Sequence, residues 1–306
     1  MGSGWQTVRA LVAECEAVLA GAAPARGESG EPFDGRREAR ALVADVAGES
    51  RTWPATMPLA TLSPAISARV RAAARRRAKG EPFEYCVGLA PFRHLVLGVD
   101  RRVLIPRPET EMLVELVLQR VDQSSPDVGV AIDVGTGSGA IALALASEGR
   151  FSRVIGTDLS ADALVVAREN AVRCAALLRA PVEFREGAGL APVQGERAIV
   201  VVSNPPYIAR SETEIVAAGV RDWEPDMALF AEADGMAVIA AIVAGGANVL
   251  DPGGLLALEV DTRRADRALQ LVRDDARYAN AEIVRDLTGR DRFVLAVRAA
   301  AHGTRG

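Results

Sequence analysis

Hydrophobic and polar positions follow two different periods along this chain. Over roughly the first eighty residues, apolar side chains recur every three or four positions, which is the spacing of an amphipathic helix. The helices that this spacing predicts are one that ends at Gly21, one over 36–47 and one over 65–79. From residue 88 to 106 the pattern becomes that of short strands, notably at 95–99 and 102–105, and a hairpin that connects two domains fits this stretch. A further amphipathic helix should span 109–121.

In the rest of the chain, apolar runs rich in β-branched residues alternate with helical patterns. We expect strands at 130–134, 154–157, 182–184, 199–202, 255–260 and 283–287. The helical patterns lie at 140–148, 161–177, 234–249 and 263–277. This alternation predicts a parallel sheet wrapped by helices. The last run, 293–297, follows a turn that leaves no room for a helix, so it should pair antiparallel with a neighbouring strand.

The composition is that of a folded globular protein. The 306 residues are 49% hydrophobic and 25% charged, which suits one large domain or two smaller ones and excludes a disordered chain. No run of about 18 uncharged apolar residues occurs, and the N-terminus lacks the layout of a signal peptide, so we expect a cytoplasmic protein with no membrane span. The cysteines Cys15, Cys86 and Cys174 are scattered, as reduced thiols are. Neither His94 nor His302 lies near a cysteine at metal-ligand spacing, so we expect no metal.

Charge is distributed unevenly between the two parts. Residues 1–108 carry 16 basic and 11 acidic side chains, whereas 109–306 carry 20 basic and 29 acidic ones, a net charge of -9. The basic residues in the helix predicted at 65–79 are Arg69, Arg71, Arg75, Arg76, Arg77 and Lys79. They could form a patch that binds an acidic or RNA-bound partner, or simply a solvated helix face, and we favour the second interpretation.

A glycine-rich turn follows the first predicted strand of the sheet. The apolar run 131–134 leads into the turn Gly135–Gly139, after which a helical pattern begins. Such a turn lets backbone N–H groups approach a ligand closely. Asp158 lies nineteen residues beyond Gly139, at the end of the next strand, where a carboxylate can accept both hydroxyls of a ribose. The turn has the spacing GxGxG rather than GxGxxG, which favours S-adenosylmethionine (AdoMet) over a dinucleotide.

A second motif, Asn204-Pro205-Pro206-Tyr207, comes directly after the apolar run 199–202. The carboxyl end of this strand should open onto the ligand crevice of the sheet. Prolines have no N–H, so this turn presents carbonyl acceptors, and the Asn204 side-chain oxygen adds another acceptor. Tyr207 supplies a flat ring. The motif therefore predicts a receptor for a planar NH2 group, either a carboxamide or a nucleobase amine.

The chemistry of such a group also predicts how catalysis would work. Its nitrogen is a poor nucleophile because its lone pair is delocalised. Acceptors for both hydrogens can raise the electron density on nitrogen and align the lone pair with a sulfonium methyl group. Catalysis would then consist mostly of positioning and preorganised electrostatics, without a dedicated general base.

With these motifs, the sequence resembles the bacterial peptide chain release factor glutamine N5-methyltransferases (HemK/PrmC family). The segments that carry the resemblance are 104–111 (Leu-Ile-Pro-Arg-Pro-Glu-Thr-Glu), 133–139, 158–160, 203–208, 224–225, 228–229 and 289–292. Adenine-N6 and guanine-N2 methyltransferases share the Asn-Pro-Pro-Tyr motif. The Pro-Arg-Pro-Glu-Thr-Glu run is far more specific, and together the two motifs make the resemblance strong.

The resemblance implies an α/β fold with a small N-terminal helical domain. The second domain would be a class I AdoMet-dependent methyltransferase, with a seven-stranded, Rossmann-like sheet whose last strand is antiparallel. The corresponding bounds are 1–87 for the helical domain, 88–108 for a β-hairpin linker and 109–300 for the methyltransferase domain. The implied substrate is the glutamine of the Gly-Gly-Gln (GGQ) loop of release factors, methylated by a monomer with no stable nucleic-acid binding and no membrane association.

The resemblance also assigns roles to individual residues. Those implied to bind AdoMet are Gly135, Thr136, Gly137, Ser138, Gly139, Asp158 and Asn204. Those implied to hold the glutamine are Asn204, Pro205, Pro206 and Tyr207, and among them Asn204, Pro205 and Tyr207 are the catalytic ones. The run 107–111 should either border the pocket or only make a rigid helix start.

The sequence departs from the family pattern after the third strand. Ala188-Gly189 stand where an acidic residue and an aromatic usually enclose the adenine, which predicts weaker AdoMet binding or a substitute aromatic. Three other functions stay open. The chain could methylate a glutamine of a ribosomal protein, methylate an amino group of a nucleic acid, or bind AdoMet without catalysis. The net charge of -9 in the second part argues against nucleic acid.

Overall fold

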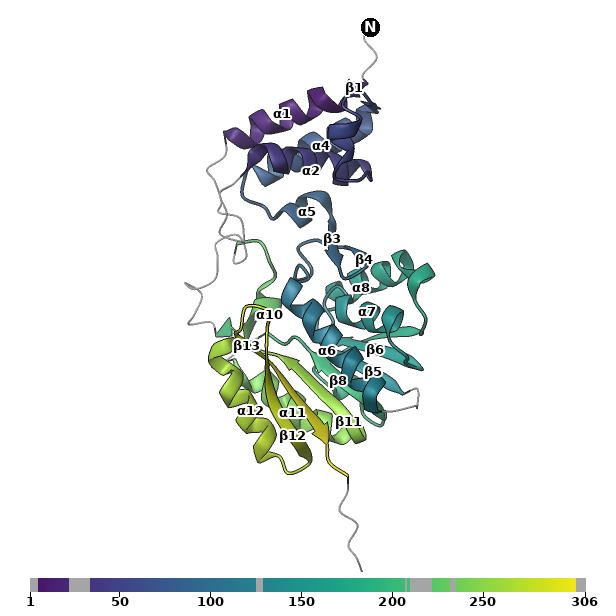
Figure 1. Cartoon of the computed structure of the whole chain (residues 1–306), viewed down its shortest axis with the longest axis vertical. Helices are drawn as coiled ribbons and strands as arrows, with labels where there is room; N and C mark the ends of the chain where they lie inside the picture. Colours follow the sequence, from purple (N-terminus) through teal and green to yellow (C-terminus); the bar gives the residue numbers. More distant parts are fainter. Residues whose placement is uncertain are drawn as a thin grey trace, which may run out of the picture. The chain divides into compact units, whose positions relative to one another are not determined.

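The structure is a computed structural model that describes residues 5–21, 34–124, 129–206, 208–209, 222–231 and 235–300. The chain divides into two compact units (Figure 1). The smaller unit is described over 5–21, 34–89 and 222–223, and the larger unit contains the other described residues. Each unit has its own hydrophobic core.

The smaller unit is helical, as predicted. Its helices are α1 (Val8–Ala20), α2 (Gly35–Ala47), α3 (Trp53–Thr56), α4 (Pro64–Arg77) and α5 (Phe83–Val87), and β1 (Gln6–Thr7) pairs antiparallel with β2 (Thr61–Leu62). The side chains of Thr7, Asp34 and Ser63 cap the first N–H groups of α1, α2 and α4. Apolar residues of these three helices, such as Leu11, Leu42 and Val70, form one buried cluster. The predicted helices over 36–47 and 65–79, and the end at Gly21, are confirmed to within two residues.

Three cations of α4 are neutralised within this unit. The ion pairs are Arg71–Glu14 at 2.6 Å, Arg76–Glu81 at 2.5 Å and Arg77–Glu38 at 2.8 Å. The first and the last join α4 to α1 and to α2, so they help hold the helices together. These cations therefore have a structural role, which weakens the interpretation of α4 as a patch for an acidic partner.

The larger unit is built on a seven-stranded sheet with the order β12-β13-β11-β8-β5-β6-β7. Its strands are β5 (Val130–Val134), β6 (Arg153–Asp158), β7 (Val182–Glu186), β8 (Ala198–Ser203), β11 (Leu250–Glu259), β12 (Tyr278–Arg285) and β13 (Asp291–Arg298). Neighbours from β11 to β7 are parallel, whereas β13 is antiparallel to both β11 and β12. The predicted parallel sheet with an antiparallel last strand is confirmed.

Helices cover both faces of this sheet (Figure 1). They are α6 (Pro108–Ser124), α7 (Ala140–Glu148), α8 (Ala161–Arg173), α11 (Met236–Val249) and α12 (Ala265–Asp274), with shorter helices at Ala175–Leu177, Ala191–Val193, Thr262–Arg264 and α10 (Asp226–Leu229). A small parallel pair joins β9 (Ile208–Ala209) to β10 (Phe230–Ala231).

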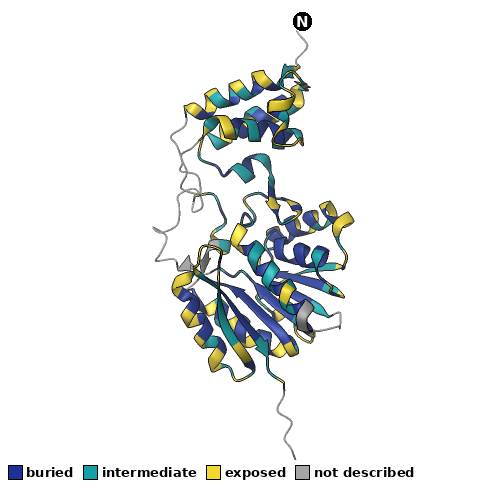
Figure 2. Cartoon of the chain, viewed as in Figure 1, coloured by how far each residue is buried: buried dark blue, intermediate teal, exposed yellow. Residues whose placement is uncertain are grey.

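Successive residues of one strand belong to opposite cores. In β8, Val200 and Val202 pack in the cluster with α6 and α7, while Val201 packs in the cluster with α11 and α12. Figure 2 shows the result, a buried sheet between helices whose outer sides are exposed. Because both faces of β8 are covered, its run is continuously apolar rather than alternating.

A hairpin is present within residues 88–106, as the pattern predicted. The strand at 95–99 is present as β4 (Leu95–Gly98), but its partner is β3 (Leu89–Phe92) and not the run 102–105. A turn intervenes at Asp100, whose carbonyl accepts from Val103 N and whose carboxylate accepts from Arg102 N. The tight connection between β3 and β4 instead requires Arg93 to adopt a left-handed φ of 53°.

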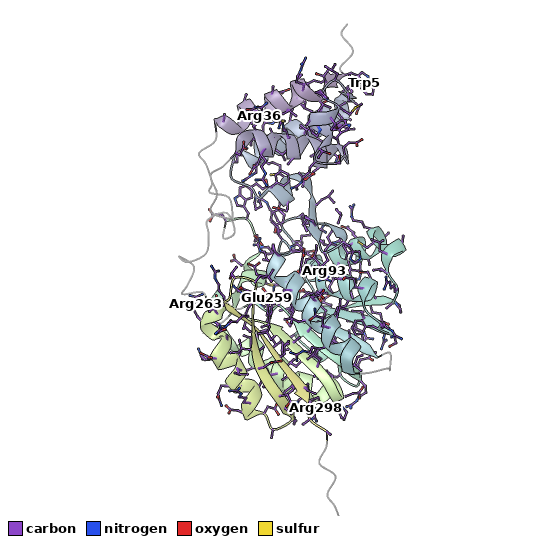
Figure 3. The ribbon with its side chains drawn as sticks, in the orientation of Figure 1. Trp5, Arg36, Arg93, Glu259, Arg263 and Arg298 are labelled. Atoms are coloured by element: carbon purple, nitrogen blue, oxygen red, sulfur yellow. The ribbon has the colours of Figure 1, made fainter. Side chains whose placement is uncertain are left out.

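Arg93 also fastens the hairpin to the helices of the larger unit (Figure 3). Its guanidinium donates to Glu148 twice at 2.5 Å and to Glu115 at 2.8 Å, and its backbone N–H donates to Glu111 at 2.9 Å. The side chain is only 17% exposed. The cost of the unusual φ is therefore offset by a forked, largely buried network of ion pairs.

We predict that Arg93→Ala lowers the free energy of unfolding by about 1–3 kcal/mol, because two carboxylates lose their shared cation. Urea unfolding followed by circular dichroism measures this loss. Arg285→Ala is the control, since Arg285 is 72% exposed in its pair with Asp291 and should change stability by less than about 0.5 kcal/mol. Equal stabilities for Arg93→Ala and the unaltered protein would contradict a stabilising role for the ion pairs of Arg93.

Candidate active site

The glycine-rich turn after β5 is held by backbone hydrogen bonds to the end of β6. The N–H groups of Gly135 and Thr136 both donate to Thr157 O, at 2.8 and 2.9 Å. Gly135 and Gly137 have φ values of 74° and 54°, which residues other than glycine rarely adopt. A Cβ atom added at either position would meet no atom within 4 Å. The turn is thus tied to the end of β6, and no atom fills the space beside Gly135 and Gly137.

Gly139 has a different role, because its surroundings are crowded. A Cβ atom there would lie 3.3 Å from the Phe184 ring and 3.4 Å from Ala167 of α8. The glycine therefore allows close packing of α8 and β7 beneath the turn. Asn170 of α8, also buried, donates to Ser138 O at 2.9 Å and fixes the turn from below.

Asp158 lies beside this turn, at the end of β6. Its Oδ2 accepts from Gly137 N at 2.8 Å and its Oδ1 accepts from Ser160 N at 2.9 Å. Burial raises the pKa of the carboxyl, and these backbone N–H groups partly oppose that rise. Each oxygen keeps a further lone pair, so the carboxylate can still accept hydroxyl groups of a ribose.

Asp133, within β5, is a fully buried carboxyl under the same turn. Its Oδ2 accepts from Thr136 Oγ1 at 2.6 Å and from Ala142 N at 3.1 Å, whereas Oδ1 has no hydrogen-bond partner among the described residues. Burial raises the pKa of Asp133 to about 7, with a further contribution from the charge of Asp158. Asp133 thus joins the turn to the first turn of α7.

The second predicted motif begins where β8 ends. Ser203 is buried and donates from Oγ to Val134 O at 2.6 Å, which ties the end of β8 to β5. Asn204 is half-buried, Pro205 is buried and Pro206 is half-buried. Tyr207, the fourth residue of the motif, lies outside the described residues. The structure therefore brings Asn204 to the same edge of the sheet as the glycine-rich turn, since β5 and β8 pair in parallel.

Asn204 is connected to two side chains from other elements. Its Nδ2 donates to Thr110 Oγ1 at 3.0 Å, and Thr110 Oγ1 donates to Glu259 Oε2 at 2.8 Å. Thr110 lies in the first turn of α6 and Glu259 is the last residue of β11. Both side chains are buried, and Glu259 lies in the interior of the larger unit, whereas Arg263 lies at its edge (Figure 3).

The run 107–111 starts a helix, and one of its residues is hydrogen-bonded to the second motif, while its place at the border of a pocket stays a prediction. Pro108 begins α6, and Thr110 contacts Asn204. Arg107 forms an ion pair with Glu224, whose side chain is fully buried and also accepts from Ile105 N. This pair joins the start of α6 to the chain that follows residue 221.

The sequence pattern does not reveal the roles of Thr110, Glu259 and Asp133. One signal could have pointed to Glu259. It is an acidic residue at the end of an apolar strand, and parallel strands of one sheet end at the same edge. For Thr110 the only signal was its place in the run 107–111, because its contact with Asn204 depends on how α6 packs over the sheet.

The surroundings of Ala188-Gly189 bear on the predicted adenine pocket. Thr157 Oγ1 donates to Gly189 O at 2.8 Å, which holds this segment next to the end of β6. Phe184 is not a substitute aromatic, because its ring packs under Gly139 and Gly156 against the core. The apolar side chain exposed beside Asp158 is Leu159, with 62% of its surface accessible.

The sequence matches two family models, the PrmC N-terminal domain at residues 28–88 and the Methyltransferase small domain at residues 109–221. The release factor glutamine methyltransferase of Burkholderia pseudomallei (strain K96243) is 42% identical over 259 residues, which cover 83% of this chain and 89% of that protein. That of Yersinia pestis is 38% identical over 260 residues, covering 85% and 91%. The chain belongs to the release factor glutamine methyltransferase family.

A solved structure agrees on the fold. The hMettl16 catalytic domain, in complex with MAT2A 3'UTR hairpin 6, matches with a TM-score of 0.53 at 13% sequence identity, over 85% of this chain and 93% of that chain. At this identity the likeness concerns the fold alone. The predicted fold class, a class I methyltransferase with an N-terminal helical domain, is confirmed, and the protein is an AdoMet-dependent methyltransferase.

The part of the methyltransferase that the structure describes contains neither a candidate metal site nor a candidate membrane-spanning helix. No group of three or more His, Cys, Asp or Glu side chains there could hold a metal ion. None of its described helices is both long and apolar enough to cross a membrane.

The buried carboxyl of Asp133 predicts a pH dependence of stability. Between pH about 4 and about 7 the folded methyltransferase keeps a proton on Asp133 that the unfolded chain releases. The free energy of unfolding should therefore fall as pH rises through this window, by up to about 4 kcal/mol from this group. Asp133→Asn should remove this part of the decline, as measured by urea unfolding from pH 5 to pH 8.

Asp251→Asn is the matched control for the loss of one carboxyl group, because Asp251 pairs with Arg197 at the surface. An Asp133→Asn profile parallel to that of the unaltered protein would show that Asp133 is ionised throughout.

Proposed function

We propose that this methyltransferase transfers a methyl group from AdoMet to the side-chain amide nitrogen (N5) of the glutamine in the GGQ motif of peptide chain release factors. The observation that carries the proposal is the setting of Asn204, whose Nδ2 is engaged by Thr110 and whose Oδ1 accepts no hydrogen bond from the described residues. That oxygen is available to a substrate N–H. The family to which the chain belongs supports the choice of glutamine and of release factors.

The residues that we propose to hold AdoMet lie in the glycine-rich turn, at the end of β6 and directly after β8. They are Gly135, Thr136, Gly137, Ser138, Gly139 and Asp158, with Asn204 at the border of the site. The open space at Gly135 and Gly137 and the spare lone pairs of Asp158 suit a nucleoside. Leu159, exposed beside Asp158, can cover an adenine face in place of the missing aromatic. When bound, AdoMet supplies an electrophilic methyl group.

The glutamine side chain would be held by Asn204, Pro205, Pro206 and Tyr207. The Asn204 Oδ1 and the Pro205 carbonyl each accept one N–H of the carboxamide, and neither proline can donate a competing hydrogen bond. The Tyr207 ring stacks on the amide plane. Asn204, Pro205 and Tyr207 are thus the proposed catalytic residues, and they act by orienting the nitrogen and raising its electron density.

We also propose domain bounds, an oligomeric state and a location in the cell for this protein. We assign 1–87 to an N-terminal helical domain, 88–108 to a hairpin linker and 109–300 to the AdoMet-dependent domain. The protein should act as a monomer in the cytoplasm, where release factors work. It should form no stable complex with nucleic acid, because residues 109–306 carry a net charge of -9 and phosphates favour a basic surface.

We predict that the unaltered protein adds one methyl group to the GGQ glutamine of a release factor, and that Asn204→Ala lowers the rate at least about 100-fold, because the carboxamide loses an oriented acceptor. Mass spectrometry of the GGQ peptide measures the product. AdoMet affinity, measured by calorimetry, should stay within a few fold. Asn248→Ala is the control, since Asn248 only accepts a hydrogen bond from Arg277 at an exposed site.

The same assay separates the alternatives when ribosomal proteins and nucleic acid are offered beside the release factor with methyl-labelled AdoMet. Label on a ribosomal-protein glutamine, or on RNA or DNA, with none on the release factor would refute the proposed substrate. A protein that binds AdoMet and labels nothing would be a binding module.

A further inference from the structure

Thr110, Asn204 and Glu259 are brought together by the sheet and by one helix. Strands β8 and β11 are parallel neighbours, and Leu258 pairs with Ser203, so the next residues, Glu259 and Asn204, lie side by side at the carboxyl edge. Helix α6 packs against both strands, and its first turn places Thr110 between the two side chains. The resulting chain of hydrogen bonds runs from Asn204 Nδ2 through Thr110 Oγ1 to Glu259 Oε2.

Counting protons fixes the direction of these hydrogen bonds. An ionised carboxylate can only accept, so Glu259 must take the single hydroxyl proton of Thr110. The Thr110 oxygen then has only lone pairs to offer Asn204, and the amide must turn its NH2 group toward it. Asn204 Oδ1 consequently points away from Thr110. This is the orientation that a substrate carboxamide needs, because it leaves an acceptor for the substrate N–H.

We propose that Glu259 is a positioning residue for Asn204, and that through the Thr110 hydroxyl it fixes the asparagine amide with Oδ1 free to accept from the substrate. The assignment rests on the proposed function only in naming glutamine as the substrate. Glu259 acts through Thr110, to which it is hydrogen-bonded. An asparagine amide by itself can bind in two orientations related by a half-turn, and only one of them suits a substrate NH2 group.

Protonation of Glu259 would remove the constraint on the orientation of the Asn204 amide. A neutral carboxyl can donate its proton to Thr110 Oγ1, and the hydroxyl proton of Thr110 is then free to donate to Asn204 Oδ1. In that arrangement the amide turns its NH2 group toward the substrate NH2 group, and two donors face each other. The productive orientation therefore depends on the ionised form of Glu259.

The surroundings of Glu259 place this change near neutral pH. Burial raises the pKa of its carboxyl to about 7, and the charge of Glu109 in α6 adds to the rise. The Thr110 hydrogen bond opposes it, as do the charges of Arg292 in β13 and Arg107 before α6. Turnover should accordingly increase as pH rises through about 7, the folded-state pKa of this group.

The first test compares Thr110→Val with Thr110→Ser. Valine keeps the shape of threonine without the hydroxyl, so kcat/KM for the release factor should fall on the order of 100-fold through misorientation. Serine keeps the hydroxyl and should retain most of the activity. AdoMet affinity and the urea midpoint serve as controls for folding. Equal activity of the two variants, whether high or low, would overturn the role of the hydroxyl.

The second test needs no substrate. The side-chain NH2 signals of Asn204, identified by their loss in Asn204→Ala, are followed by NMR from pH 5.5 to pH 8.5. In the unaltered protein they should shift with a midpoint near 7. In Glu259→Gln, where no carboxyl remains, that midpoint should disappear, and the rise of kcat/KM through the same pH range should flatten.

These two measurements separate the inference from the proposed function. An Asn204 signal that titrates identically in Glu259→Gln and in the unaltered protein would overturn the positioning role, whatever the substrate is. A signal that titrates as expected in a protein that leaves release factor unmethylated would support the positioning role and refute the proposed substrate.

Discussion

The site depends on the parallel pairing of β8 with β5 on one side and β11 on the other. Because all three strands run the same way, their last residues meet at one edge of the sheet. The glycine-rich turn after β5, Asn204 after β8 and Glu259 at the end of β11 are far apart in sequence and adjacent in space. Continuous apolar runs, buried on both faces, fix this pairing by the free energy of their burial.

Two carboxyls are buried at this edge at a cost in stability. Burial raises the pKa values of Asp133 and Glu259 to about 7, so neither group is stabilised in its ionised form as a surface carboxylate would be. Each accepts a hydrogen bond from a threonine hydroxyl, Asp133 from Thr136 and Glu259 from Thr110. The first orders the turn proposed to hold AdoMet, and the second orders the asparagine proposed to hold the substrate. The two buried carboxyls thus lower the stability of the fold, but their hydrogen bonds fix the geometry of the turn and of the asparagine.

Periodicity predicted most of the fold, and it failed where local pattern was ambiguous. The run 102–105 looks like a strand, but the Asp100 turn and the prolines after Ile105 keep it out of the hairpin, and β3 takes its place through the left-handed Arg93. The basic helix α4 looked like a surface feature. Its ion pairs with Glu14 and Glu38 depend on α1 and α2 packing beside it, which no local pattern shows.

By itself, the sequence determined the order of helices and strands, the antiparallel last strand and the two motifs at the strand ends. These follow from side-chain period and from the special backbones of glycine and proline, which are local properties. The hydrogen bonds of Asn204 to Thr110 and of Thr110 to Glu259 were decided only by the tertiary structure. Three residues separated by 94 and 149 positions along the chain can meet only after the sheet and α6 have packed, since no periodic signal links them.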